Sequence, residues 1–332
     1  MRSKLFALFV PVVAIWPAVA HDAGPGLKMD AACLALNQTV TDLVAKGRLA
    51  DAEAVLSGVL PGPKEGTPEP YCLWLIHYHR ATVIGLSGRI SEAEALAERS
   101  LKIMDGLCSP GDPARLGPLH LLWSAQQQQE KMGRARQTFR KMQLLRLEAP
   151  RDQAAFHGAA ASQLHAEGKL KEAETQYLKA IDAWRELGSG ETTIAALLVD
   201  LGKLQMSQGR YPEAGTALDR ALTIVQSVKE AVPMDLINVV RTRGVLFARQ
   251  GKWQAAAEDY GPAMAMVDRD TRLDPGQRKL MMDTFAYILR KAHRTKEARS
   301  IEALALAMQA PGSTTGIVDV SELANSAKTR KK

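Results

Sequence analysis

Several features that mark enzymes are missing from this chain of 332 residues. It has no Cys-x-x-Cys, no His-Glu-x-x-His, no phosphate-cradling glycine loop and no Gly-x-Ser-x-Gly, the usual signs of metal, nucleotide and hydrolase sites. His77 and His79 lie two residues apart in a helical pattern, so their side chains point to different faces and cannot share a metal. We therefore predict no catalytic residue, no metal site and no cofactor, and interpret the chain as a non-enzyme.

Aromatic residues are scarce, at 5% of the sequence, and no strand-rich block is present. Hydrophobic residues still make up 46%, which is enough for a continuous core. The composition favours a stack of helices packed through small side chains.

Cysteine is nearly absent, with Cys33, Cys72 and Cys108 as its three occurrences. Cys72 and Cys108 are expected near the same end of one helical hairpin, so a Cys72–Cys108 disulfide is one interpretation. Two buried free thiols are the alternative, and Cys33 is a rival partner near that end. An odd number leaves at least one cysteine unpaired within the chain.

The body of the chain lacks a strong excess of either charge. The formal net charge is +7, but six basic residues lie at the two ends and leave +1 for the rest. This excludes the overall basic footprint typical of nucleic-acid binders. The four C-terminal basic residues form a tail that weakly favours anionic surfaces, although a solvated end is the preferred interpretation. They are Lys328, Arg330, Lys331 and Lys332.

Long hydrophobic runs are missing except at the start, where Leu5–Trp16 follows a basic beginning and precedes a small-x-small pattern at residues 18–20. This order predicts a secretory signal peptide over residues 1–20. A membrane anchor needs about 20 apolar residues, and this run is shorter and is interrupted by Pro11. We therefore expect an exported bacterial protein, periplasmic or extracellular, with no membrane span after cleavage.

A short phrase repeated seven times is the strongest positive signal. It reads Gly-Arg-Tyr-Pro-Glu-Ala at residues 209–214. The turns of its copies are placed near residues 47, 88, 133, 168, 209, 251 and 293, in steps of 41, 45, 35, 41, 42 and 42. A nearly constant period of this length indicates a repeat architecture. The copy at Gly133 is weaker and its unit departs from the pattern.

Helical periodicity surrounds each copy. Residues 192–208 and 214–228 carry apolar side chains at steps of three and four, as amphipathic helices do. Gly209 can adopt positive φ to end the first helix, while Pro212 and Glu213 suit the first turn of the second. The unit is therefore predicted to be a helix–turn–helix hairpin, which must stack on its neighbours to bury its apolar face.

Small residues recur at equivalent places in the hairpins and are predicted to let helices approach closely. They lie early in the second helix, seven residues further on, or seven residues before the turn. The predicted packing residues are Ala93, Ala173, Gly202, Ala214, Ala221, Gly244, Ala256, Ala263 and Ala298.

These residues resemble the signature of the tetratricopeptide repeat family. Two units carry its small, turn, aromatic, small, large and small positions in order: Gly202, Gly209, Tyr211, Ala214, Leu218 and Ala221, then Gly244, Gly251, Trp253, Ala256, Tyr260 and Ala263. The units exceed the family's usual length and are similar to the kinesin-light-chain type. The resemblance implies an all-α fold, a right-handed superhelix (solenoid) of about seven hairpins over residues 29–309. Residues 21–28 would be a flexible N-terminus and residues 310–332 a C-terminal extension.

The family binds peptides on a concave face lined by first helices, so the resemblance implies ligand-binding positions here. They are Tyr78, Thr82, His120, Trp123, Gln127, Ser162, His165, Lys203, Arg241, Tyr287 and Arg290. Tyr78 and Trp123 are predicted either to anchor an extended peptide or to fill the stack. The second half of the groove is predicted to be mildly basic, because it carries the three cations Lys203, Arg241 and Arg290 and the single acid Asp283.

The function predicted from these observations is an exported adaptor or scaffold that binds a protein or peptide in this groove. One alternative is a structural array that associates with itself. Another is a subunit of an enzyme or cell-envelope complex whose active site lies on a partner.

Overall fold

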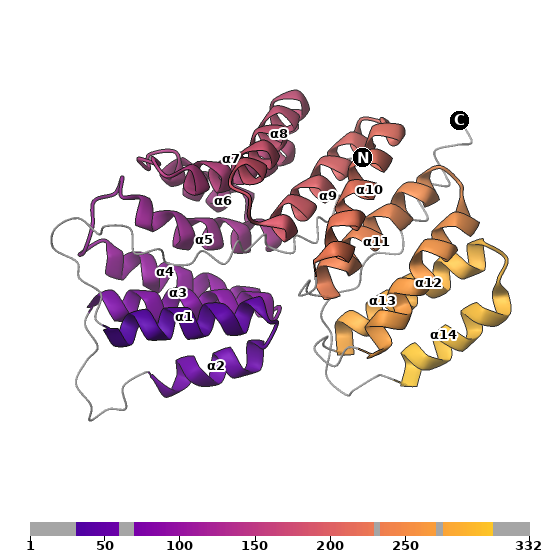
Figure 1. The fold of residues 1–332 in the computed structure, drawn as a ribbon, viewed down its shortest axis with the longest axis horizontal. Coiled ribbons are helices and arrows are strands. Elements are labelled where there is room, and N and C mark those ends of the chain that lie inside the picture. Colours follow the sequence, from indigo (N-terminus) through magenta and orange to yellow (C-terminus); the bar gives the residue numbers. More distant parts are fainter. Residues whose placement is uncertain (1–30, 60–69, 229–232, 270–274, 308–332) are drawn as a thin grey trace. The chain divides into compact units, whose positions relative to one another are not determined.

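The computed structural model describes residues 31–59, 70–228, 233–269 and 275–307, and helices are the regular structure in this part of the chain (Figure 1). The predicted signal peptide, the segment 21–28 and the extension 310–332 lie outside the described residues.

Fourteen α-helices and one short 3-10 helix follow one another within the described ranges. They are α1 (Ala31–Ala45), α2 (Leu49–Gly58), α3 (Pro70–Leu86), α4 (Ile90–Met104), η1 (Pro113–Arg115), α5 (Leu116–Gln128), α6 (Met132–Met142), α7 (Pro150–Ala166), α8 (Leu170–Glu186), α9 (Glu191–Ser207), α10 (Tyr211–Ser227), α11 (Pro233–Arg249), α12 (Trp253–Arg269), α13 (Pro275–Lys291) and α14 (Thr295–Ala307).

The helices form two units that divide between Thr193 and Ile194, near the start of α9. In the first unit α1/α2, α3/α4, α5/α6 and α7/α8 are hairpins whose successive helices pack together. The second unit holds the hairpins α9/α10, α11/α12 and α13/α14. The predicted all-α fold of about seven hairpins is thus confirmed, while the single domain over residues 29–309 stays a prediction.

The repeated phrase forms the turn inside six of the seven hairpins. Gly209 has φ 75° and lies in the left-handed region that favours glycine. Its N–H donates to the Met206 carbonyl at 3.1 Å, and the Arg210 N–H donates to the Gln205 carbonyl at 2.9 Å. These bonds satisfy carbonyls that the end of α9 would otherwise leave without a partner. The predicted role of Gly209 in ending the first helix is confirmed.

The basic residue after the turn pairs with the acid three residues later. Arg210 lies 3.1 Å from Glu213 across this spacing. The same pair occurs in three other hairpins, as Arg48–Asp51, Arg89–Glu92 and Arg294–Glu297. Exposed pairs of this kind add little stability each, so their recurrence reflects a shared turn geometry rather than a large energy.

The third turn lies at Glu130 and not at the predicted Gly133. Glu130 has φ 57°, its N–H bonds the Gln127 carbonyl and the Lys131 N–H bonds the Gln126 carbonyl, as around Gly209. Gly133 instead lies in the first turn of α6. The corrected steps are 42 residues from Gly88 to Glu130 and 38 from Glu130 to Gly168. The predicted position of this turn was wrong because glycine usually occupies the left-handed position of a turn, whereas here a glutamate occupies it.

The small residues at the predicted packing positions are buried. Ala214 and Ala256 are fully enclosed, as are Ala173, Ala221 and Ala298. A Cβ atom on Gly202 would lie 3.0 Å from Leu218 Cγ, and one on Gly244 would lie 2.8 Å from Tyr260 Cε2. At both glycines the neighbouring helix comes too close for a side chain.

The structure pairs Cys33 with Cys72 and leaves Cys108 as a free thiol. The Cys72–Cys108 interpretation is therefore wrong, and the rival partner is the correct one. Cys33 on α1 and Cys72 on α3 lie on first helices of consecutive hairpins that contact each other, with Cα atoms 5.8 Å apart. Cys108 follows the second helix α4, where its Sγ donates to the Met104 carbonyl at 3.6 Å.

Candidate functional site

Tyr78 and Trp123, the two predicted aromatic anchors, lie inside the first unit. Trp123 is 1% exposed, and its Nε1–H donates to Gln163 Oε1 at 3.0 Å. With the corrected turn, Trp123 lies seven residues before Glu130, where the first hairpin carries Val40 and the other five carry alanine or glycine. Tyr78 is 5% exposed and packs where a Cβ atom on Gly117 would stand. In this conformation both rings fill the helical stack.

Thr82 is also buried and donates its hydroxyl to the Tyr78 carbonyl at 3.0 Å. Such a bond to the residue four positions earlier satisfies the hydroxyl within its own helix. Ser162 is buried as well, with its Oγ 3.2 Å from the Tyr177 hydroxyl.

Three of the predicted groove residues in the first unit are partly exposed: His120 and Gln127 on α5, and His165 on α7. The His120 ring centroid lies 5.4 Å from that of Trp123, and burial lowers the pKa of His120 to about 4. His120 is therefore a neutral imidazole at neutral pH, with one ring nitrogen to donate and one to accept a hydrogen bond.

A chain of hydrogen bonds joins α5 to α7 beside these residues. Gln163 Oε1 accepts from Trp123 Nε1 and, at 3.3 Å, from Gln127 Nε2. Gln163 Nε2 in turn donates to Glu167 Oε1 at 2.9 Å, a bond that lowers the pKa of Glu167. Gln127 on α5 is thus held by a hydrogen bond to Gln163 of α7.

The charged groove positions of the second unit are mostly ion-paired. Lys203 Nζ lies 2.8 Å from Asp200, and Arg290 Nη2 lies 2.6 Å from Glu302. Asp283 is paired with Lys279 at 2.6 Å. The cations from which we predicted a basic half of the groove are therefore largely neutralised by nearby acids, and Arg241 is partly exposed.

Tyr287 is a partly exposed aromatic side chain on α13. Its ring meets that of Trp253 edge-on at 6.0 Å between centroids, and Lys291 Nζ lies 5.6 Å from the ring centroid. Burial raises the pKa of its hydroxyl. The hydroxyl oxygen of Tyr287 is itself buried, so only the ring is partly exposed in this conformation.

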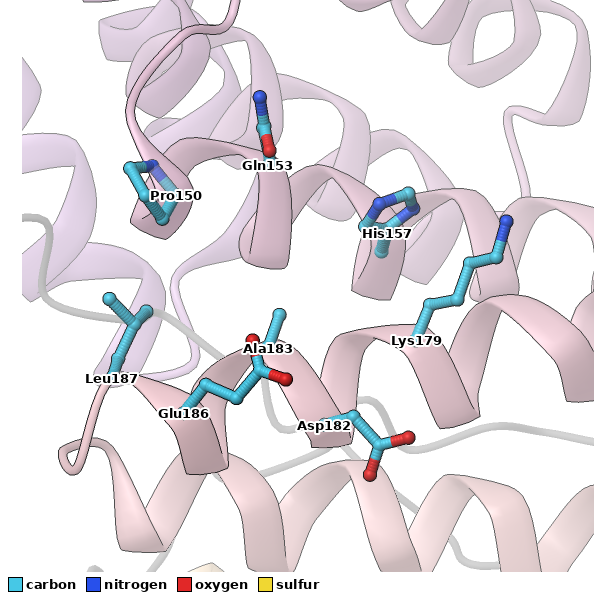
Figure 2. A pocket seen from close by; sticks show the side chains of 8 residues that line it. All are labelled: Pro150, Gln153, His157, Lys179, Asp182, Ala183, Glu186 and Leu187. Carbon is cyan, nitrogen blue, oxygen red and sulfur yellow. The ribbon is translucent and has the colours of Figure 1, made fainter.

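A pocket of about 510 Å³ lies on the α7/α8 hairpin, within the first unit (Figure 2). Pro150, Gln153 and His157 line it from α7. Across the opening, α8 and the residue after it contribute Lys179, Asp182, Ala183, Glu186 and Leu187. Sequence reasoning missed this pocket, and the residues of α7 that line it gave no distinct signal, because other hairpins also carry polar residues at these positions.

Metal-binding clusters of three or more His, Cys, Asp or Glu side chains do not occur among the described residues. His79 is buried and its Nε2 lies 2.8 Å from Asn37 Oδ1, whereas His77 is partly exposed. Over the same part of the chain, every helix is too short or too polar to cross a bilayer.

Comparison with a family model matches residues 152–227 to the tetratricopeptide repeat. No curated protein matches the chain in sequence. Among solved structures, the chain is similar to a Rap protein complexed with competence and sporulation factor, with 12% identity, a TM-score of 0.59, and coverage of 90% of this chain and 89% of that one.

Two further structures share the fold. NprR in complex with its cognate peptide NprX is 13% identical, with a TM-score of 0.57 over 96% of this chain and 93% of that one. BtubC (BKLC) from P. vanneervenii is 16% identical, with a TM-score of 0.50 over 74% of this chain and 98% of that one. Residues 152–227 thus match the tetratricopeptide repeat in sequence, and the chain shares the fold of these solved structures over most of its length.

Proposed function

We propose that the chain is an exported scaffold without catalysis of its own, which binds a protein or peptide along the first helices of its hairpins. The observation that carries the proposal is the group of partly exposed hydrogen-bonding side chains on α5 and α7, namely His120, Gln127 and His165. Amide and imidazole groups can donate to and accept from the backbone of an extended peptide.

The hydrogen bond that holds Gln127 also supports binding. Gln127 is bonded to Gln163, which Trp123 holds from the other side, so binding loses less side-chain entropy than it would with a freely rotating amide. Two structures that share the fold, NprR and the Rap protein, are described as complexes with a peptide and with competence and sporulation factor.

Selection from a random peptide library with the mature chain, residues 21–332, tests the proposal. We expect extended peptides whose affinity, measured by fluorescence anisotropy, falls about tenfold in Gln127→Ala and in His165→Ala, which corresponds to about 1.4 kcal/mol. Gln137→Ala is the matched control, because Gln137 is exposed on the second helix α6. Failure to select any peptide, or equal losses in Gln127→Ala and Gln137→Ala, would contradict binding at this site.

Export is proposed from the N-terminal residues and is supported by the Cys33–Cys72 pair, since disulfides persist mainly in oxidising compartments. Expression of the full chain in a diderm bacterium, followed by fractionation and intact-mass measurement, tests it. We expect periplasmic protein that begins at His21. Cytoplasmic protein that retains residues 1–20 would refute export.

A further inference from the structure

Two polar residues of α7 line the α7/α8 pocket at positions that are apolar in two hairpins of the second unit. Fifteen and eleven residues before the turn, the fifth hairpin carries Ile194 and Leu198, and the sixth carries Leu236 and Val240, all of them buried. The same positions before Gly168 are Gln153 and His157, which are exposed and partly exposed. Polar side chains stand at both positions of α7, so this helix contributes a polar wall to the pocket.

The α7 wall is fixed by a hydrogen bond. His157 Nδ1 lies 2.7 Å from Gln176 Oε1 of α8, and an amide oxygen can only accept. His157 therefore carries a proton on Nδ1 and uses it for this bond. The ring is held in one orientation, beside Gln153 on the pocket side of α7 (Figure 2).

The α8 wall carries more acid than base. Asp182 and Glu186 are four residues apart, so their carboxylates lie on one face of the helix, and both line the pocket. Asp182 is paired with Arg185 at 2.9 Å, an exposed contact that is easily exchanged, whereas no ion pair of Glu186 is found in the described residues. Lys179 is the one basic lining residue.

The pocket is open, and part of its lining is apolar. Pro150, Ala183 and Leu187 supply carbon surface, while the charged lining residues are exposed. A site that encloses a small molecule buries most of the ligand's surface. An open pocket with a partly apolar lining and two carboxylates instead suits side chains carried by the surface of another protein.

We propose that this pocket is a second binding site, in which a partner protein places a basic side chain against Asp182 and Glu186 and a neighbouring apolar side chain against Pro150, Ala183 and Leu187. Gln153 can bond the partner's backbone between the two. The site lies on other residues than the group His120, Gln127 and His165, so it does not depend on the function proposed above.

Methyl NMR of the mature chain with a blocked dipeptide, acetyl-Arg-Leu-amide, tests this site. We expect saturable shifts of the Ala183 and Leu187 methyl signals at millimolar peptide, since a contact of this size gives weak binding. The double substitution Asp182→Asn/Glu186→Gln should raise the dissociation constant about fivefold. This corresponds to the upper end of the free energies measured for exposed charge pairs. These exposed side chains can change without loss of the fold.

Two comparisons make the test decisive. Glu172→Gln removes an exposed acid from the first turn of α8, away from the pocket, and should leave the affinity unchanged. Acetyl-Glu-Leu-amide should bind less tightly than the arginine peptide. Absence of methyl shifts, equal binding of the two peptides, or a preference for the glutamate peptide through Lys179 would each overturn the proposal. Loss of this binding in Gln127→Ala would also overturn the independence of the two sites.

Discussion

Asn37 of α1 and His79 of α3 are joined by a hydrogen bond of 2.8 Å between Asn37 Oδ1 and His79 Nε2, and both side chains are buried. Since the amide oxygen accepts, His79 donates from Nε2. The bond lies on the same pair of helices as the Cys33–Cys72 disulfide. The first hairpin is therefore attached to the second by a covalent bond and by a buried polar contact.

Acidification is expected to destabilise the first unit through His79. Burial lowers the pKa of His79 to about 4, below the usual value of 6.5. Between these values the unfolded chain binds a proton that the folded chain does not, so the free energy of unfolding falls as the pH drops from about 6.5 to about 4. The full effect is about 3 kcal/mol.

Urea unfolding at a series of pH values measures this loss. Between about pH 4 and 6.5, His79→Gln should reduce the slope of the free energy of unfolding against pH by up to about 1.4 kcal/mol per pH unit. His293→Asn is the control, because His293 is exposed and asparagine tolerates its positive φ. An unchanged slope in His79→Gln would show that His79 is not the buried neutral group assigned here.

Reduction of the Cys33–Cys72 disulfide should release the first hairpin at lower denaturant concentration. The bond closes a loop of 39 residues, which corresponds to about 3–4 kcal/mol of chain entropy. Cys33→Ser/Cys72→Ser should reproduce the effect of a reductant, whereas Cys108→Ser should leave the response to reductant intact. Thiol labelling without reductant, read by mass spectrometry, should modify Cys108 alone. Labelling of Cys33 or Cys72 would contradict the pairing.

How much the sequence can predict depends on whether the information is local. The turn at Gly209 was readable because glycine, proline and an acid each act on their own backbone. The partner of Cys72 was not readable, since it depends on α1 and α3 lying side by side. Burial of Trp123 was one of two interpretations, and the wrong turn at Gly133 left the choice between them open. Once Glu130 is the turn, Trp123 occupies a small-residue position, and its burial follows.

Close helix approach at Gly244 predicts opposite effects of two similar substitutions. Gly244→Ala places a Cβ atom 2.8 Å from Cε2 of Tyr260, whose buried ring is stacked on Phe285 and has little room to move. The strain should lower the free energy of unfolding by about 1–3 kcal/mol. In Gly215→Ala the nearest atom is at 3.7 Å, an ordinary contact, so the helix should gain about 0.5–1 kcal/mol. Urea unfolding monitored by circular dichroism compares the two, and equal stabilisation would show that Gly244 is not a contact point.

The left-handed Glu130 offers the sharpest test of the corrected repeat. A non-glycine residue at φ 57° costs about 1–2 kcal/mol, and replacing it by glycine removes that strain while adding freedom to the unfolded chain. Glu130→Gly should therefore raise the free energy of unfolding by up to about 1 kcal/mol. Gly209→Ala makes the reverse change at the equivalent turn and should lower it by a similar amount. If the third turn were at Gly133 instead, Glu130→Gly would put a glycine into a helix and destabilise the chain, so the sign of the change in melting temperature decides between the two registers.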